Sequence, residues 1–174
     1  TGQMSAAKLS EKDFVASIVK RPDLRFFLAY GQDESAISAI AHAMAKSLSA
    51  DAEAIDLDSG RLRGDPALLL DEAASSSLFG GSRYIRLHFS RDEAHDAVAN
   101  LPEAQQAGTP VIATGGNLTK ASKLLKLVQG HRLALSHICY APSDTDAAER
   151  VATLARAQGL KMDHVLAAQI ARYT

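Results

Sequence analysis

The chain has 174 residues, of which 47% are hydrophobic and 22% charged, and its 19 lysines and arginines nearly balance its 20 aspartates and glutamates. Such a composition is typical of a globular protein of about one domain with room for the start of a second, and it suggests neither a disordered chain nor a protein that coats polyanions. One cysteine leaves no internal disulfide and no cysteine-cluster metal site, which fits a reducing compartment. The longest apolar runs fall far short of the roughly 20 residues that cross a bilayer, so we expect a cytoplasmic protein with no membrane contact.

Hydrophobic periodicity predicts helices that alternate with strands. Residues 1–3 precede the first methionine and are interpreted as the remnant of an expression tag. The predicted elements, in chain order, are helix 10–20, strand 25–30, helix 33–48, strand 52–57, helix 65–73, strand 83–89, helix 92–101, strand 109–114, helix 119–130 and strand 133–140. The start signals that place the helices are Ser10, Asp33, Asp65 ahead of Pro66, and Thr119. Since parallel neighbours need crossover connections, this order predicts an α/β fold with a mainly parallel five-stranded sheet and helices on both faces.

The pattern changes after residue 142. Ser143, with Asp146 three residues later, starts one helix, Asp163 starts another, and no strand follows them. We therefore expect an α/β domain over 4–142, followed over 143–174 by the first two helices of a small helical domain, which we expect to be incomplete.

The turn after the first predicted strand is where an α/β protein would hold a phosphate, because glycine lets backbone N–H groups approach it and the helix dipole favours its charge. Here the turn has one glycine, Gly31, and neither a G-K-[ST] nor a G-x-G-x-x-G pattern. Asp33 and Glu34 bring two carboxylates to the start of the helix, which suits the helix but repels a triphosphate. The third strand also ends without an acidic residue to hold Mg²⁺. We expect a degenerate phosphate loop that binds no nucleotide or other cofactor; the alternative is a nonstandard phosphate site.

Other catalytic patterns are missing from the sequence. Cys139 falls in a predicted buried strand, where it is interpreted as an inert apolar residue. Asp56 and Asp58 close the second strand, but without a glycine fingerprint they are interpreted as a polar strand end. The histidines show neither H-x-x-x-H nor H-E-x-x-H spacing, so we expect no metal site. They are His42, His88, His95, His131, His137 and His164.

A run of lysines stands out from an otherwise balanced charge pattern. No Asp or Glu occurs over 104–143, whereas Lys120, Lys123 and Lys126 recur every third residue, and we expect them to share one exposed face of the helix at 119–130. That face is a candidate contact for nucleic acid or for an acidic partner protein, and the simpler interpretation is a solvated helix face. No aromatic residue is interleaved with the lysines, which argues against a stacking platform for single strands.

The predicted loop 75–83, Ser-Ser-Ser-Leu-Phe-Gly-Gly-Ser-Arg, contains an apolar pair, Leu78 and Phe79. Seen alone, the pair either packs into the core of its own domain or is presented to a partner. If presented, Phe79 would remove ~150–250 Å² from water, a gross gain of several kcal/mol before association costs.

Three segments together resemble the delta subunit of bacterial DNA polymerase III, the clamp-opening subunit of the clamp loader. The first is Phe27-Leu-Ala-Tyr-Gly-Gln-Asp-Glu34. The second is Asp65-Pro66 followed by Ser77-Leu-Phe-Gly80 and Arg83. The third is Asn117-Leu-Thr-Lys-Ala-Ser-Lys-Leu124. They follow the family's order and spread over most of the chain, and the Leu-Phe loop combined with the L-x-K-x-S-K-L segment is the most specific feature.

The resemblance implies an AAA+-like first domain that has lost its nucleotide site, then a helical lid domain, then a helical collar domain that joins the other clamp-loader subunits. We expect this chain to end before the collar, and we therefore expect clamp binding to survive without assembly. By carry-over, Leu78 and Phe79 enter a pocket on the sliding clamp, the ring-shaped beta subunit. Without hydrolysing ATP itself, the protein would favour the open ring.

The resemblance thus implies a noncatalytic bacterial replication subunit of a DNA-directed DNA polymerase, a nucleotidyltransferase holoenzyme. In the assembled loader, primer–template DNA is a further partner, with Lys120, Lys123 and Lys126 as the candidate contact. Two alternatives stay open. One is a nucleotide-binding or NTPase domain with a nonstandard phosphate loop, and the other is a DNA-binding AAA+-like module.

Overall fold

The computed structural model describes residues 9–75, 80–101 and 108–173. The chain divides into two compact units, Thr1–Cys139 and Tyr140–Thr174. Its elements, in chain order, are α1 (Glu11–Lys20), β1 (Phe26–Gly31), α2 (Glu34–Leu48), β2 (Glu53–Asp58), α3 (Ser59–Gly64), α4 (Ala67–Ala74), β3 (Arg83–Phe89), α5 (His95–Asn100), β4 (Val111–Gly115), α6 (Lys123–Gly130), β5 (Ala134–Cys139), α7 (Asp144–Ala157) and α8 (His164–Ala171).

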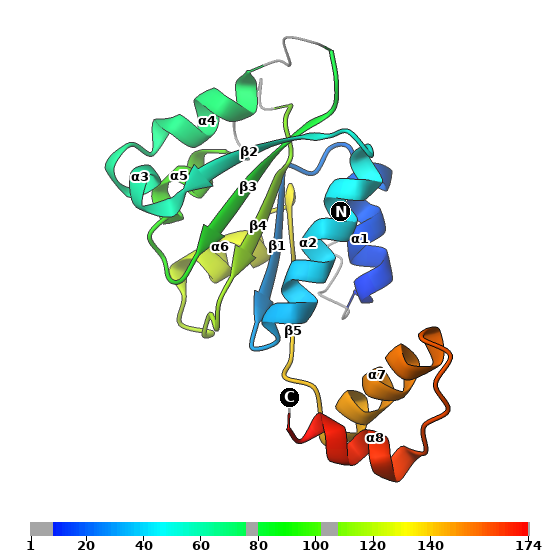
Figure 1. The fold of residues 1–174 in the computed structure, drawn as a ribbon. Helices are drawn as coiled ribbons and strands as arrows, with labels where there is room; N and C mark the ends of the chain where they lie inside the picture. The colour runs from blue at the N-terminus through cyan, green and yellow to red at the C-terminus, as the bar shows by residue number, and fades with distance from the viewer. Residues whose placement is uncertain (1–8, 76–79, 102–107, 174) are drawn as a thin grey trace. The chain divides into compact units, whose positions relative to one another are not determined.

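The first unit is built on one five-stranded sheet in the order β2-β3-β4-β1-β5, and every pairing in it is parallel. The predicted α/β class and the five-stranded parallel sheet are therefore confirmed. β1 lies between β4 and β5. Because all the strands are parallel, their carboxyl ends meet at one edge of the sheet (Figure 1). That edge holds the turns that lead from β1 into α2 and from β4 into α6.

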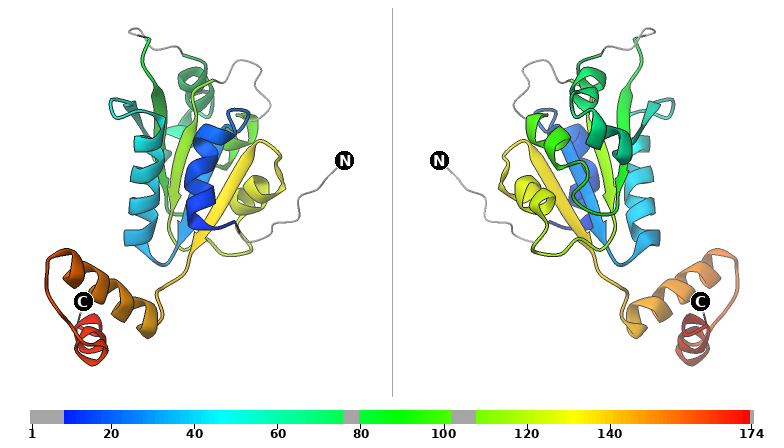
Figure 2. Two further views of the ribbon diagram at one scale, coloured as in Figure 1. Left: turned by 90° about the vertical axis from the view of Figure 1, so that its right-hand side faces the viewer. Right: turned by 90° about the vertical axis from the view of Figure 1, so that its left-hand side faces the viewer.

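Helices cover both faces of the sheet, and each face has its own apolar core. On one face, α3, α4, α5 and α6 bury the core that contains Phe26, Leu28, Leu87 and Phe89. On the other face, α1 and α2 bury a smaller core around Phe27. Figure 2 shows the sheet between α2 and α6, which lie on opposite sides of it. Every residue of β1 is buried, as expected of a central strand in a parallel sheet, whose two faces are both covered.

Four start signals were predicted correctly, and two were wrong. Ser10 and Asp33 cap α1 and α2, and Ser143 and Asp163 cap α7 and α8, each through its side-chain oxygen. Thr119 was expected to cap α6, but the N-cap is Ser122, whose Oγ accepts from Leu125 N at 3.1 Å. Asp65 was expected to cap α4, but that helix begins after Pro66, which itself has αR backbone angles and makes no side-chain cap.

Two further differences lie between the second and fourth strands. The short helix α3 was not predicted; it starts at Asp58, whose Oδ1 accepts from Arg61 N at 3.1 Å. The helix expected over 92–101 covers only His95–Asn100. A single turn closed by the hydrogen bond from His95 N to the Asp92 carbonyl precedes it, and the side chains of Asp92 and Glu93 accept from the N–H groups of Lys123 and Ser90.

The second unit is a helical hairpin of α7 and α8. Ser143 and Asp146 form a reciprocal capping box at the start of α7, and Gly159 follows α7 with a φ of 73°, as is common just after a helix. Ala167 of α8 is fully buried, whereas Val165 is 69% exposed.

Gly31 is where the sheet limits which residue can follow β1. Its φ is 137°, and a Cβ added to it would lie 2.1 Å from the Cys139 carbonyl oxygen on β5. Real Cβ atoms do not come so close to backbone, so only glycine lets β1 and β5 approach in this way.

We expect Gly31→Ala to lower the free energy of unfolding by at least ~2 kcal/mol, because alanine meets both a disfavoured φ and the backbone of β5. Urea denaturation followed by circular dichroism measures this. Gly130→Ala is the matched control: this helical glycine has open space around its Cβ, and the change should be neutral or stabilise by about 0.5–1 kcal/mol. Equal stability of Gly31→Ala and the wild type would contradict the close approach.

Candidate functional sites

The turn from β1 into α2 uses its own N–H groups inside the protein. Gly31 N donates to the Gly116 carbonyl at 3.2 Å, and Gln32 N and Asp33 N donate to the Cys139 carbonyl at 3.0 and 3.4 Å. The Asp33 side chain is buried and accepts from Ala36 N at 3.0 Å. In a phosphate-binding loop such N–H groups point at the ligand. Here, three consecutive N–H groups and one from the first helical turn already have acceptors.

The start of α6 is closed in a similar way by a carboxylate from another loop. Ser122 Oγ donates to Asp92 Oδ1 at 2.5 Å, and the N–H groups of Lys123 and Leu124 donate to the two Asp92 oxygens at 3.1 and 3.2 Å. Burial raises the pKa of Asp92, but these hydrogen bonds outweigh it and hold the pKa below its usual range. Asp92 therefore acts as a second cap on α6, in the place where an anionic ligand would otherwise bind.

We expect Asp92→Asn to lower stability by about 0.5–2 kcal/mol at pH 7, because the amide has one acceptor oxygen for three donors, turns its NH₂ group towards a donor and loses the charge that favours the helix dipole. Because the pKa of Asp92 is lower in the folded protein than in the unfolded chain, its contribution is present above ~pH 3.9 and is lost as the pH falls through the folded pKa. The gap between variant and wild type should therefore narrow in acid, which urea titrations at several pH values measure. Asp51→Asn, at an exposed turn before β2, is the control and should change stability by less than ~0.5 kcal/mol.

Two further acidic groups, one on β2 and one in the loop after β3, also have structural partners. Arg86 Nη2 donates to Asp56 Oδ2 at 2.7 Å, and this hydrogen bond lowers the pKa of Asp56. Glu93 accepts from the N–H groups of Ser90 and Arg91 at 2.9 and 2.8 Å. Among residues 9–75, 80–101 and 108–173, no three histidine, cysteine or acidic side chains come together as a metal site. None of the helices described there is long and apolar enough to span a bilayer.

The histidines and the cysteine lie in separate environments. His88 Nδ1 is 2.9 Å from Thr114 Oγ1, His95 Nδ1 is 2.9 Å from Asp96 Oδ1, and the His137 ring stacks on Phe14 with centroids 5.3 Å apart. Cys139 is 4% exposed. The structure does not bring these side chains together into a single site.

The predicted lysine face is only partly as expected. Lys123 and Lys126 are exposed on α6, but Lys120 lies in the turn that precedes the helix. The three lysines therefore do not share one helical face. Sequence reasoning also missed Arg91, an exposed residue next to Asp92, because only the fold brings its loop to the start of α6.

Leu78 and Phe79, the predicted clamp-binding pair, lie outside the described residues, but both ends of their loop are described. Ser75 ends α4, with its N–H donating to the Asp71 and Glu72 carbonyls. Beyond the pair, Gly80 has a φ of 70°, and β3 begins at Arg83. The pair is thus carried between the end of α4 and the start of β3.

Arg83 ties these two ends together. Its Nη1 donates to the Ser75 carbonyl at 3.2 Å, and its Nη2 lies 3.8 Å from Glu72 Oε2 on α4. Its Nε is 3.5 Å from Glu53 Oε2 on β2, an ion pair without hydrogen-bond geometry. The Arg83 side chain is only 13% exposed, so one guanidinium holds α4, β2 and β3 at the base of the loop.

We expect Arg83→Met to lower stability by about 1–3 kcal/mol, because it leaves polar groups at the base of the loop without their partner. Arg86→Met is the matched control on the same strand: its ion pair with Asp56 is 55% and 65% exposed, and its loss should cost at most about 1 kcal/mol. Urea denaturation of the two variants gives the comparison. Equal losses would contradict a special role for Arg83.

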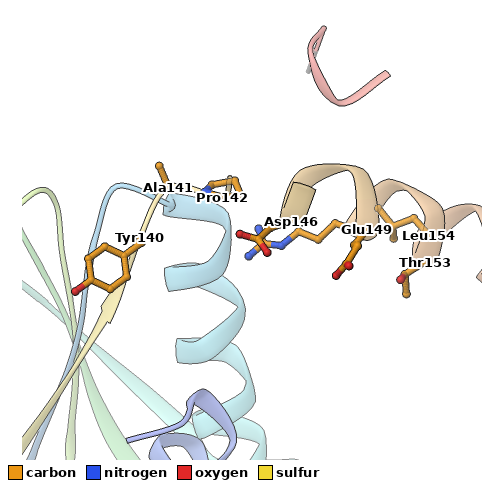
Figure 3. A pocket seen from close by; sticks show the side chains of 8 residues that line it. Tyr140, Ala141, Pro142, Asp146, Glu149, Thr153 and Leu154 are labelled. Carbon is orange, nitrogen blue, oxygen red and sulfur yellow. The ribbon is translucent and has the colours of Figure 1, made fainter. Parts of the chain in front are cut away.

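The second unit has an open surface hollow beside the start of α7 (Figure 3). Its charged side chains are Asp146, Glu149 and Arg150, and exposed apolar surface comes from Tyr140 and Leu154. The Asp146 carboxylate already accepts hydrogen bonds from Ser143 in the capping box, and these bonds hold its pKa below the usual range. The hollow therefore holds no concentrated set of groups that would define a ligand.

No protein-family model matches the chain, and no curated protein matches its sequence. A functional assignment therefore depends on the chain's own residues and fold.

Proposed function

We propose that this chain is the clamp-binding part of a delta subunit of the bacterial DNA polymerase III clamp loader, with an AAA+-like first unit and a lid-like second unit. The observation that carries the proposal is the closed turn at Gly31, where backbone N–H groups donate to the carbonyls of Gly116 and Cys139. This arrangement favours a binding role over nucleotide chemistry. The sequence resemblance then supplies the partner, a sliding clamp.

The position of that turn supports the proposal. β1 and β4 are neighbours in the sheet, and the helices that follow them pack on its opposite faces. Open α/β sheets bind their ligands at the carboxyl ends of two such strands, where the connections leave towards opposite faces. Here that place is occupied by the protein's own backbone hydrogen bonds at β1 and by Asp92 at α6. The position in which open α/β sheets bind a ligand is therefore filled from within, which supports a binding protein over a nucleotide-using one.

In the proposed mechanism, Leu78 and Phe79 anchor the protein on an apolar clamp pocket. Burying Phe79 alone contributes roughly 4–6 kcal/mol gross before association costs. A partner that binds the open ring more tightly than the closed ring shifts the ring population without hydrolysing anything. A shift from 1:99 to 99:1 needs ~5.5 kcal/mol of preference, which is comparable to the gross gain of one such anchor plus a supporting surface.

We expect Leu78→Ala combined with Phe79→Ala to abolish binding to a purified bacterial sliding clamp, measured by calorimetry without nucleotide. The control is Leu160→Ala with Tyr173→Ala, which removes apolar groups that are 59% and 92% exposed on the second unit and should leave the affinity unchanged. Circular dichroism checks that both variants fold. Clamp binding at wild-type affinity by the Leu78/Phe79 variant would refute the proposal.

The two alternatives have different signatures. Tight, Mg²⁺-dependent binding or turnover of ATP by the chain would support the NTPase alternative. Salt-sensitive DNA binding without any clamp binding would support a DNA-binding AAA+-like module.

A further inference from the structure

The structure brings a fourth cation to the lysines at the start of α6. Asp92 Oδ2 accepts from Lys123 N at 3.1 Å, so the loop that contains Arg91 lies directly against the first turn of this helix. Lys120 belongs to the turn that leads into the same helix, where Ser122 N donates to the Thr119 carbonyl at 2.9 Å. The loop that follows β3, which contains Arg91, and the turn that follows β4, which contains Lys120, therefore meet at the first turn of α6, which begins with Lys123. Figure 1 shows that β3 and β4 end at the same edge of the sheet.

These cations are available to a ligand. Arg91, Lys120, Lys123 and Lys126 are all exposed, and none of them forms an ion pair with the described part of the chain. The carboxylate among them, Asp92, already accepts three hydrogen bonds at the start of α6. The other acidic group in the same loop, Glu93, accepts from Ser90 N and Arg91 N. The local excess of charge is therefore positive in a protein whose net charge is −1.

The chemistry of the surface selects the kind of anion. Long cationic side chains from two loops and one helix suit a row of phosphates, because phosphate contacts need charge and reach and read no base sequence. The sequence has no Phe, Tyr or Trp between 90 and 101 or between 116 and 130, so the surface lacks the large aromatic rings on which unpaired bases stack.

We propose that Arg91, Lys120, Lys123 and Lys126 form one surface that binds the phosphate backbone of double-stranded DNA without sequence preference. The inference rests on the proposed contact between the lysines and primer–template DNA. It adds Arg91 as a contact and the duplex as the form of DNA that is bound. It does not depend on Leu78 or Phe79, so clamp binding and duplex binding can fail separately.

The test uses the whole chain and a fluorescent 20-base-pair DNA duplex, with anisotropy read from about 20 to 200 mM salt. The logarithm of the binding constant should fall linearly with the logarithm of the salt concentration, by about 0.9 for each phosphate contact. Arg91→Gln and Lys123→Gln should each reduce the magnitude of that slope by about 1 and weaken binding to unrelated duplexes alike. Lys46→Gln, an exposed lysine on α2 on the opposite face of the sheet, is the control and should change neither quantity.

Three results would overturn the inference: no duplex binding at 20 mM salt, an unchanged slope for Arg91→Gln, or the same loss for Lys46→Gln. Tighter binding of the single strand than of the duplex would replace the duplex by single-stranded DNA and also contradict the proposal. The sliding-clamp affinity of Arg91→Gln, measured on the same preparation, separates this inference from the proposed function. A variant that loses duplex binding and keeps clamp binding shows that the two surfaces act independently.

Discussion

The fit between β1 and β5 is the constraint on which the proposed function depends. The Cys139 carbonyl accepts from Gln32 N and Asp33 N, and the Gly31 Cα packs so tightly against the same peptide that a Cβ would come within 2.1 Å of the oxygen. A loop that holds phosphates has to leave its N–H groups directed outward. In this protein they are directed at an adjacent strand, so the sheet itself closes the position in which such a fold binds a ligand.

The same solution recurs along the carboxyl edge of the sheet. The first turns of α2, α3 and α6 each receive a carboxylate from the protein, namely Asp33, Asp58 and Asp92. Each carboxylate satisfies N–H groups that no helical partner reaches and lies favourably in the helix dipole. The edge is thus stabilised by charges that also discourage a bound anion, except where exposed cations outnumber the carboxylates, beside α6.

Local signals were enough to predict much of the fold. The alternating strands and the caps at Ser10, Asp33, Ser143 and Asp163 depend on residues within one turn of the element they start, so the sequence carries them directly. The predicted cap of α6 was wrong because Ser122 and Asp92 act together across 30 residues. α3 was missed because Asp58 was interpreted only as the end of a strand and not also as a helix cap. Arg91 joins the proposed DNA-binding surface only through the same contact between Asp92 and α6. Arg83, by contrast, belongs to one of the segments that resemble the delta-subunit family, but its role in joining three elements depends on tertiary packing.

These contacts also bear on how the proposed clamp-binding protein could act on its partner without hydrolysing a nucleotide. A surface changes a partner's conformation only by the difference between its affinities for the two states, and any energy spent on ordering the binder itself is subtracted from that difference. The Arg83 guanidinium joins the ends of the 75–83 loop to α4 and β2. The Asp92 carboxylate likewise ties the loop after β3 to the first turn of α6, where Lys123 lies. The free energy of ordering these supports is therefore supplied during folding, which leaves more of the proposed anchor's gain for the partner.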